Sequence, residues 1–180
     1  MRRVWPAIVL GAVRLSAAEV RLDPAHTEVE YVVDSTLHSV HGTFKLKRGD
    51  FAFDPVTGKA SGELVVDAAS GNSGSGARDR RMNDSILESA KYPEIVFRPD
   101  RIEGNVLASG HSDVRLHGIF AMHGGEHEMT VPLAVDGADG VYNAKANFEV
   151  PYIKWGLKNP STFILRVNDK VHLTVKTVAK

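Results

Sequence analysis

Alternation of apolar and polar residues with a period of two runs through most of this chain and restricts its fold more than any other feature. In segment 28–34, Val29, Tyr31 and Val33 alternate with mostly acidic residues. The pattern is typical of strands that bury one face and leave the other in water. It recurs in the segments 40–47, 51–53, 61–67, 94–98, 113–117, 128–135, 142–150, 162–167 and 170–178.

These segments predict eight or nine strands joined mostly by short turns, and such a meander predicts a closed antiparallel β-barrel. A flat sheet would keep two open edges and an uncovered apolar face, and closure removes both problems. An eight-stranded barrel either fills its interior with side chains or holds one slender ligand. Small residues on the apolar faces favour a cavity, although large neighbours could fill the space equally well; these small residues are Gly42, Gly62, Ala144 and Ala146.

The first eighteen residues have the composition of an export signal. Met1-Arg2-Arg3 is basic, residues 4–13 are largely apolar, and Ser16-Ala17-Ala18 provides small residues for cleavage after Ala18. The apolar run is too short to span a bilayer, so no integral membrane segment is expected. The sequence therefore predicts a signal peptide over 1–18, a barrel domain over 19–180, and a periplasmic or secreted protein.

Charge and cysteine content exclude several classes of function. The chain has 22 basic and 22 acidic residues, without the clustered basic excess that nucleic-acid binding needs. It has no cysteine, which excludes disulfides, thiol catalysis and thiolate metal sites. A Gly-x-Ser-x-Gly motif for nucleophilic catalysis is also absent. We expect a protein that is not an enzyme and has no cofactor.

Residues 70–97 interrupt the alternation. The glycine- and serine-rich run 70–76 lacks the Gly-Lys-Ser/Thr ending of a phosphate-binding loop. Segment 77–89 instead spaces Met82, Ile86 and Leu87 as the apolar stripe of a short helix, which Pro93 ends. So short a helix needs an apolar surface to lie on. Because a barrel mouth provides one, the segment predicts a helical lid.

Four motifs carry a resemblance to a known family: 22–30 (LDPAHTEVE), 38–44 (HSVHGTF), 78–97, which opens with Arg78-Asp79, and Leu116-His-Gly118. Together they resemble the YceI-like family, also called polyisoprenoid-binding lipocalin-like proteins, over residues 22–178. The resemblance implies an extended barrel, exported from the cytoplasm, whose lumen holds a long isoprenoid chain in some members. Members can pair, so it leaves a homodimer open. Arg81-Met82 and residues 119–123 depart from the family pattern near the expected mouth, which prevents transfer of a head-group preference.

The expected ligand is therefore a lipophilic small molecule, an isoprenoid or isoprenoid quinone, bound by burial of apolar surface. Arg78 and Arg81, with Arg80 beside them, are expected to meet its head group through charge-assisted hydrogen bonds. Local pairing with Asp79 and Asp84 is the alternative for this helix face. The side chains expected to line the lumen are Phe44, Leu64, Met82, Phe97, Leu116, Met129, Leu133, Phe148 and Trp155. Ordinary packing, and for Trp155 a plug at the barrel end, is the alternative for each.

Two rival functions stay open at this point. His123 and His127 flank the turn Gly124-Gly125 and, with Glu126, could form a metal or catalytic site at the mouth. A zinc site would require three or four such ligands to converge. The second rival is a filled barrel without a ligand, acting as an interaction or stress-related module.

Overall fold

A computed structural model describes residues 18–180, so the predicted signal peptide lies outside the described residues apart from Ala18. Eight strands close a barrel in which each strand pairs antiparallel with the next and β8 returns to β1. The predicted antiparallel barrel is confirmed. The strands are β1 (Ala18–Val33), β2 (Val40–Phe53), β3 (Ala60–Asn72), β4 (Glu94–Glu103), β5 (Gly110–Met122), β6 (Gly125–Ala138), β7 (Val141–Val150) and β8 (Val171–Ala179).

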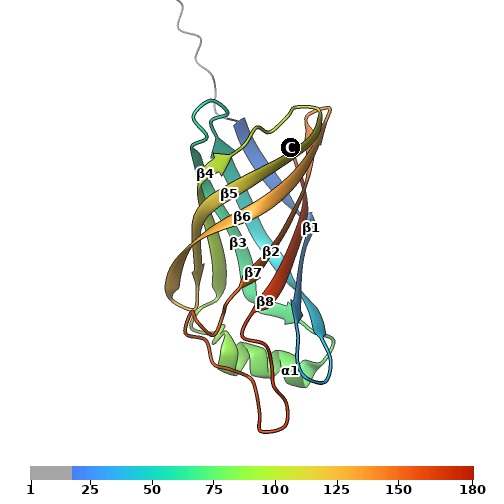
Figure 1. Cartoon of the computed structure of the whole chain (residues 1–180), viewed down its shortest axis with the longest axis vertical. Coiled ribbons are helices and arrows are strands. Elements are labelled where there is room, and N and C mark those ends of the chain that lie inside the picture. Colours follow the sequence, from blue (N-terminus) through green and yellow to red (C-terminus); the bar gives the residue numbers. More distant parts are fainter. Residues whose placement is uncertain (1–17) are drawn as a thin grey trace, which may run out of the picture.

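The barrel is elongated, and its connections gather at two ends that differ in size (Figure 1). We call the lower one in Figure 1 the helix end; it carries the connections 34–39, 73–93, 123–124 and 151–170. The opposite end, the terminal end, carries the shorter connections 54–59, 104–109 and 139–140 together with the start of β1 and the C-terminus. No helix among residues 18–180 has the length and apolar character needed to cross a lipid bilayer.

The predicted helical lid is confirmed as α1 (Gly76–Arg81) followed by one π-helical turn, η1 (Met82–Ile86). In η1 the amide of Leu87 donates to the carbonyl of Met82, which widens the helix by one residue per turn. The lid lies across the helix end of the barrel (Figure 1). A Cβ at Gly71 would collide with Met82 and Phe44, so a glycine there lets the lid settle onto β3.

The sequence prediction fails in the segment 162–167, which is not a strand. After Val150 the chain leaves the sheet and forms a long loop, 151–170, before β8 begins at Val171. Within this loop only Val167 has a strand-like partner, an isolated bridge to Ser35. The alternating residues of 162–167 therefore do not belong to a sheet, and the barrel has eight strands.

β1 is longer than its alternation predicts. Its register shifts between Leu22 and Thr27 against β8, and between Arg21 and Val29 against β2. Pro24, which lacks an amide donor, lies inside this irregular stretch, and strand prolines are confined to such bulges and edges. Because the irregularity interrupts the period-two pattern, the alternation did not predict the part of β1 that precedes residue 28.

Two of the four small residues do not widen the lumen as predicted. The ring of Tyr31 occupies the position that a side chain at Gly42 would take. Gly62 has a φ of +113°, and a Cβ there would meet the backbone of Asp50 and Phe51. Both glycines serve close packing. Ala144 and Ala146 do face the interior and line its cavity.

Candidate functional site

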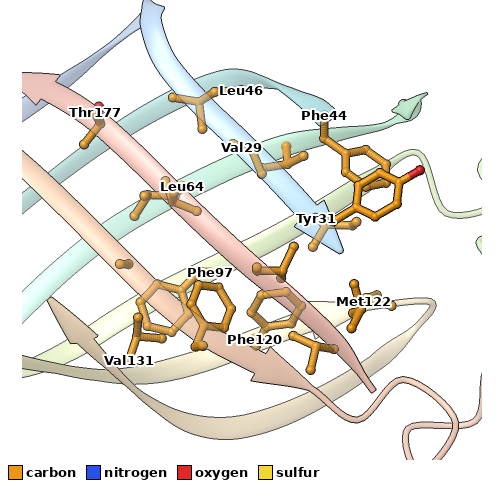
Figure 2. A pocket seen from close by; sticks show the side chains of 18 of the residues that line it. Val29, Tyr31, Phe44, Leu46, Leu64, Phe97, Phe120, Met122, Val131 and Thr177 are labelled. Atoms are coloured by element: carbon orange, nitrogen blue, oxygen red, sulfur yellow. The ribbon is translucent and has the colours of Figure 1, made fainter. Parts of the chain in front are cut away.

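A cavity of about 710 Å³ runs inside the barrel. This volume lies within the range of small-molecule sites, roughly 300–1,000 Å³. Its wall takes residues from all eight strands, from the lid and from loop 151–170. Figure 2 shows apolar side chains from opposite sides of the barrel converging on the same space, among them Val29, Leu64, Phe97, Phe120 and Val131.

The inward side chains do not fill the interior of the barrel. In a filled barrel the inward positions would be fully buried, since protein interiors pack densely. Here Leu64, Phe97, Leu133 and Phe148 line the cavity and are only half-buried. Their remaining accessible surface faces the lumen, so the barrel can accept a guest without repacking its core.

Seven of the nine side chains expected in the lumen wall lie there: Phe44, Leu64, Met82, Phe97, Leu116, Leu133 and Phe148. Their contact with a ligand stays a prediction. Met129 and Trp155 lie outside the wall, contrary to expectation. Met129 packs against the apolar residues at the helix end, and Trp155 stacks on His127 with ring centroids 4.1 Å apart.

Six buried side chains pack together at the helix end beneath the lid, and we call them the helix-end cluster: Leu87, Phe120, Met122, Val150, Tyr152 and Leu157. They come from four separate parts of the chain, namely the residue after η1, two strands and loop 151–170. Trp155 packs beside them, with its ring centroid 5.4 Å from that of Phe120. Trp155 therefore belongs to the packing at the helix end, and its interpretation as a plug stays a prediction.

Sequence reasoning missed several wall residues. Tyr31 has the correct parity for an inward position, so the alternation could have found it. Leu157, Leu165 and Val167 reach the wall from loop 151–170, where the alternation of 162–167 predicted a strand and not an irregular loop. Their positions follow from the path of the loop, which depends on tertiary contacts.

The middle of the cavity holds no ionised group among the residues that the structure describes. Thr177, one of the polar side chains there, shares a hydrogen bond of 2.6 Å with Thr27. Burial raises the pKa of Tyr31, and burial together with Asp169 raises the pKa of Tyr152 to about 12, so both hydroxyls stay neutral. The hydroxyl of Tyr152 donates to the carbonyl of Asn168 at 2.7 Å.

Charged lining residues are confined to the two ends of the cavity. Arg78 and Arg81 lie at the helix end, as expected for head-group contacts, whereas Glu19 and Lys180 lie at the terminal end. Arg80 is not part of the wall. The site is thus an apolar tube with a basic mouth under the lid.

Both mouth arginines already make contacts within the protein. Arg78 donates to the hydroxyl of Ser73 at 2.8 Å and to its carbonyl at 3.1 Å, while Arg81 donates to the carbonyl of Pro160 at 3.2 Å. Asp79 accepts from the same Ser73, and these hydrogen bonds lower the pKa of its carboxyl. Because each guanidinium carries five N–H donors, both arginines keep donors for a ligand.

The histidines of the rival metal site face different partners. His123 pairs with Glu88 at 2.8 Å, His127 stacks on Trp155, and Glu126 pairs with Arg98. Over residues 18–180 the structure brings together no group of three histidine or acidic side chains able to hold a metal ion. The three residues of this rival site thus contact three different partners and do not converge on one point.

Comparison with known protein families shows which family this chain belongs to. A model of the YceI-like domain matches residues 21–179. This chain belongs to the YceI-like family. A UPF0312 protein of Pseudomonas putida strain W619 is 30% identical over 132 residues, which cover 66% of this chain and 68% of the relative. A UPF0312 protein of Pseudomonas putida strain F1 is 27% identical over 148 residues, covering 76% and 74% of the two chains.

Solved structures share the YceI-like fold of this chain at low sequence identity. BcnA of Burkholderia cenocepacia superposes with a TM-score of 0.72 at 19% identity, over 88% of this chain and 99% of that one. A polyisoprenoid binding domain from Saccharophagus degradans, implicated in plant cell wall breakdown, gives 0.68 at 18% identity, over 89% and 97%. At these identities the likeness establishes the common barrel.

Proposed function

We propose that this YceI-like protein binds one lipophilic molecule, an isoprenoid or isoprenoid quinone, in the barrel cavity and carries or sequesters it without chemical change. The observation that carries the proposal is the cavity of about 710 Å³, apolar along its length and charged only at its ends. The solved relative described as a polyisoprenoid binding domain supports the same class of ligand.

Apolar burial supplies enough free energy for useful affinity. Each buried methylene contributes roughly 0.8 kcal/mol, so four five-carbon units contribute about 16 kcal/mol. Micromolar binding requires about 8 kcal/mol. The surplus offsets an association cost of up to about 8 kcal/mol, which lies within the range of about 4–15 kcal/mol. Catalytic groups are not needed for this function.

The ends of the cavity give the ligand a direction. Arg78 and Arg81 line the helix end and keep free N–H donors, which suit a polar or anionic head group. The hydrocarbon then runs toward the terminal end, past the half-buried wall residues Leu64 and Leu133. We further propose a periplasmic or secreted location, which the basic and apolar composition of residues 1–18 supports.

Narrowing the lumen tests the proposal. Ala144 lines the cavity. Its ladder partner Val135 also faces inward, so Ala134, the residue before Val135 in the same strand, points out of the barrel. We expect the protein to bind one farnesol, and Ala144→Phe to weaken binding by about tenfold or more, or 1.4 kcal/mol. Ala134→Phe adds the same ring outside the lumen and should leave the affinity unchanged. Equal affinity in all three proteins, or no binding by any, would refute lumen binding.

A further inference from the structure

The tip of loop 151–170 exposes two large apolar side chains. Phe163 is fully exposed and Ile164 is 80% exposed. The amide of Thr162 donates to the carbonyl of Leu165 at 2.8 Å, so Phe163 and Ile164 are the central residues of a tight turn. Such positions normally hold glycine, asparagine, aspartate or serine. In Figure 1 this loop, coloured red-orange, protrudes beyond α1 and forms the lower extremity of the molecule.

A third apolar side chain belongs to the same surface. Loop 34–39 lies beside the tip, because the amide of Thr36 donates to the carbonyl of Arg166 at 2.9 Å. The amide of Arg166 in turn donates to the hydroxyl of Thr36 at 3.3 Å. Leu37, the next residue, is 70% exposed. We call Leu37, Phe163 and Ile164 the apolar tip.

Basic residues outnumber acids at the end of the barrel that carries the apolar tip. The connections at the helix end contain eight lysines and arginines and five acidic residues, whereas those at the terminal end contain one lysine and two aspartates. Of the five acids, Asp84 and Asp169 are exposed, and two others are held by contacts within the protein. Asp79 and Glu88 are half-buried and bonded to Ser73 and His123, while Arg80 and Arg166 are exposed. The helix end therefore presents a positive surface.

We propose that the apolar tip inserts into the headgroup region of an anionic lipid bilayer, so that the mouth of the cavity faces the membrane. An exposed apolar group flanked by lysine and arginine is the combination that binds anionic lipid surfaces. Leu165 and Val167 follow the tip directly and line the cavity. A lipid that leaves the bilayer beside the tip thus lies next to two side chains of the cavity wall. This inference rests on the proposed function.

The small size of the tip argues against a protein partner. A stable protein interface takes roughly 20–30 residues a side. The apolar tip has three large apolar side chains, and they lie on loops that project from the barrel. A projection of this size suits insertion into a fluid interface better than a complementary protein surface. A second copy of this chain is the competing occupant.

A site-specific probe tests insertion directly. Because the chain has no cysteine, Phe163→Cys gives a unique attachment point for an environment-sensitive nitrobenzoxadiazole label. Val56→Cys is the matched control, since Val56 is 72% exposed in a connection at the terminal end. With vesicles of two parts phosphatidylcholine and one part phosphatidylglycerol, the label at 163 should shift to the blue and brighten severalfold, and the label at 56 should not. Identical responses at both positions, or none, overturn the inference.

Co-sedimentation with the same vesicles provides a second test. Because Phe163 and Ile164 are exposed, the double change Phe163→Ser and Ile164→Ser leaves the barrel folded. It should reduce vesicle binding by about tenfold, since binding strength follows buried apolar area. The matched double change Val56→Ser and Leu107→Ser removes exposed apolar groups from the terminal end and should leave binding unchanged. Equal loss in both double variants contradicts the proposed orientation.

Two further measurements distinguish failure of the membrane inference from failure of the proposed function. If the label at 163 responds to protein concentration without vesicles, the tip binds a second copy and the membrane inference is wrong. Farnesol delivered from cyclodextrin measures lumen binding without a membrane. Intact farnesol binding without vesicle binding overturns this inference and leaves the proposed function standing. Vesicle binding without farnesol binding supports the membrane contact and overturns the proposed function.

Discussion

The two ends of the barrel are built from the same eight strands and differ in everything that connects them. The helix end carries the lid, the helix-end cluster, the basic mouth and the apolar tip, which draw most of their residues from the long connections 73–93 and 151–170. The terminal end has short turns, with Glu19 and Lys180 at the edge of the cavity. The strands thus supply a general apolar tube, and the specific chemistry is added by the connections at one end.

The comparison extends to packing. The members of the helix-end cluster are 1–8% exposed, as in an ordinary core. The wall residues Leu64 and Leu133 are half-buried because they face the cavity. The members of the cluster also line the cavity, so the contrast is one of packing. Stability should depend more on the buried cluster, and ligand capacity more on the half-buried wall residues.

The largest expected effect compares two leucines that both line the cavity and differ in burial. Leu157→Ala, in the helix-end cluster, should lower the free energy of unfolding by about 2–5 kcal/mol, because it leaves a void in packed surroundings. Leu133→Ala enlarges a cavity that already exists and should cost less than about 1.5 kcal/mol. Urea unfolding of both variants measures the difference. Equal losses would show that the wall is packed as tightly as the cluster.

A smaller effect concerns the buried hydroxyl of Tyr152. Tyr152→Phe removes the hydrogen bond to Asn168 and should cost about 0.5–1.5 kcal/mol at neutral pH. Burial raises the pKa of Tyr152 from 10.0 to about 12. A raised pKa in the folded state means that this group's contribution is complete below pH 10.0 and is lost as the pH rises through about 12. The variant should lose this part of the alkaline decline, which unfolding at about pH 9 and about pH 11 would reveal. Parallel declines in the two proteins would contradict it.

The smallest expected effect is local to the lid. Glu88 follows η1 and accepts a hydrogen bond from His123, which lowers the pKa of the Glu88 carboxyl below 4.5. Its contribution is therefore present above pH 4.5 and is lost as the pH falls through the lowered pKa. Glu88→Gln should lower the protection of the lid amides against hydrogen exchange a few-fold at neutral pH.

A matched control separates the effect of the contact between Glu88 and His123 from a general loss of charge. Glu63 pairs with Arg48 at 2.7 Å on the outside of the barrel. Glu63→Gln should leave the exchange of the lid unchanged. Equal acceleration by both substitutions would mean that the contact between Glu88 and His123 does not hold the lid.

The sequence was sufficient to predict the barrel, and the reason is visible in its strands. In β6 and β7, Val131, Leu133, Ala144 and Ala146 keep the period of two and all face the lumen. The lid was predictable because Met82, Ile86 and Leu87 share one helical face. The segment 162–167 misled the same reasoning, since its alternation reflects a turn with two exposed apolar residues and two inward ones.

The site was predictable only where regular structure places it. Phe97 and Phe148 follow from strand parity, and Arg78 and Arg81 follow from the position of the lid. The position of Trp155 could not be predicted in this way, because its stacking on His127 depends on how loop 151–170 folds back. The size of the cavity also depends on the sum of many side-chain volumes around the barrel, which no local pattern in the chain contains.

Native mass spectrometry of the protein purified from its own host tests the central claim most directly. We predict one extra mass per barrel, released by organic solvent and identified as an isoprenoid or isoprenoid quinone. A protein that carries no such mass, and that takes up no prenyl lipid when one is added, would contradict the account.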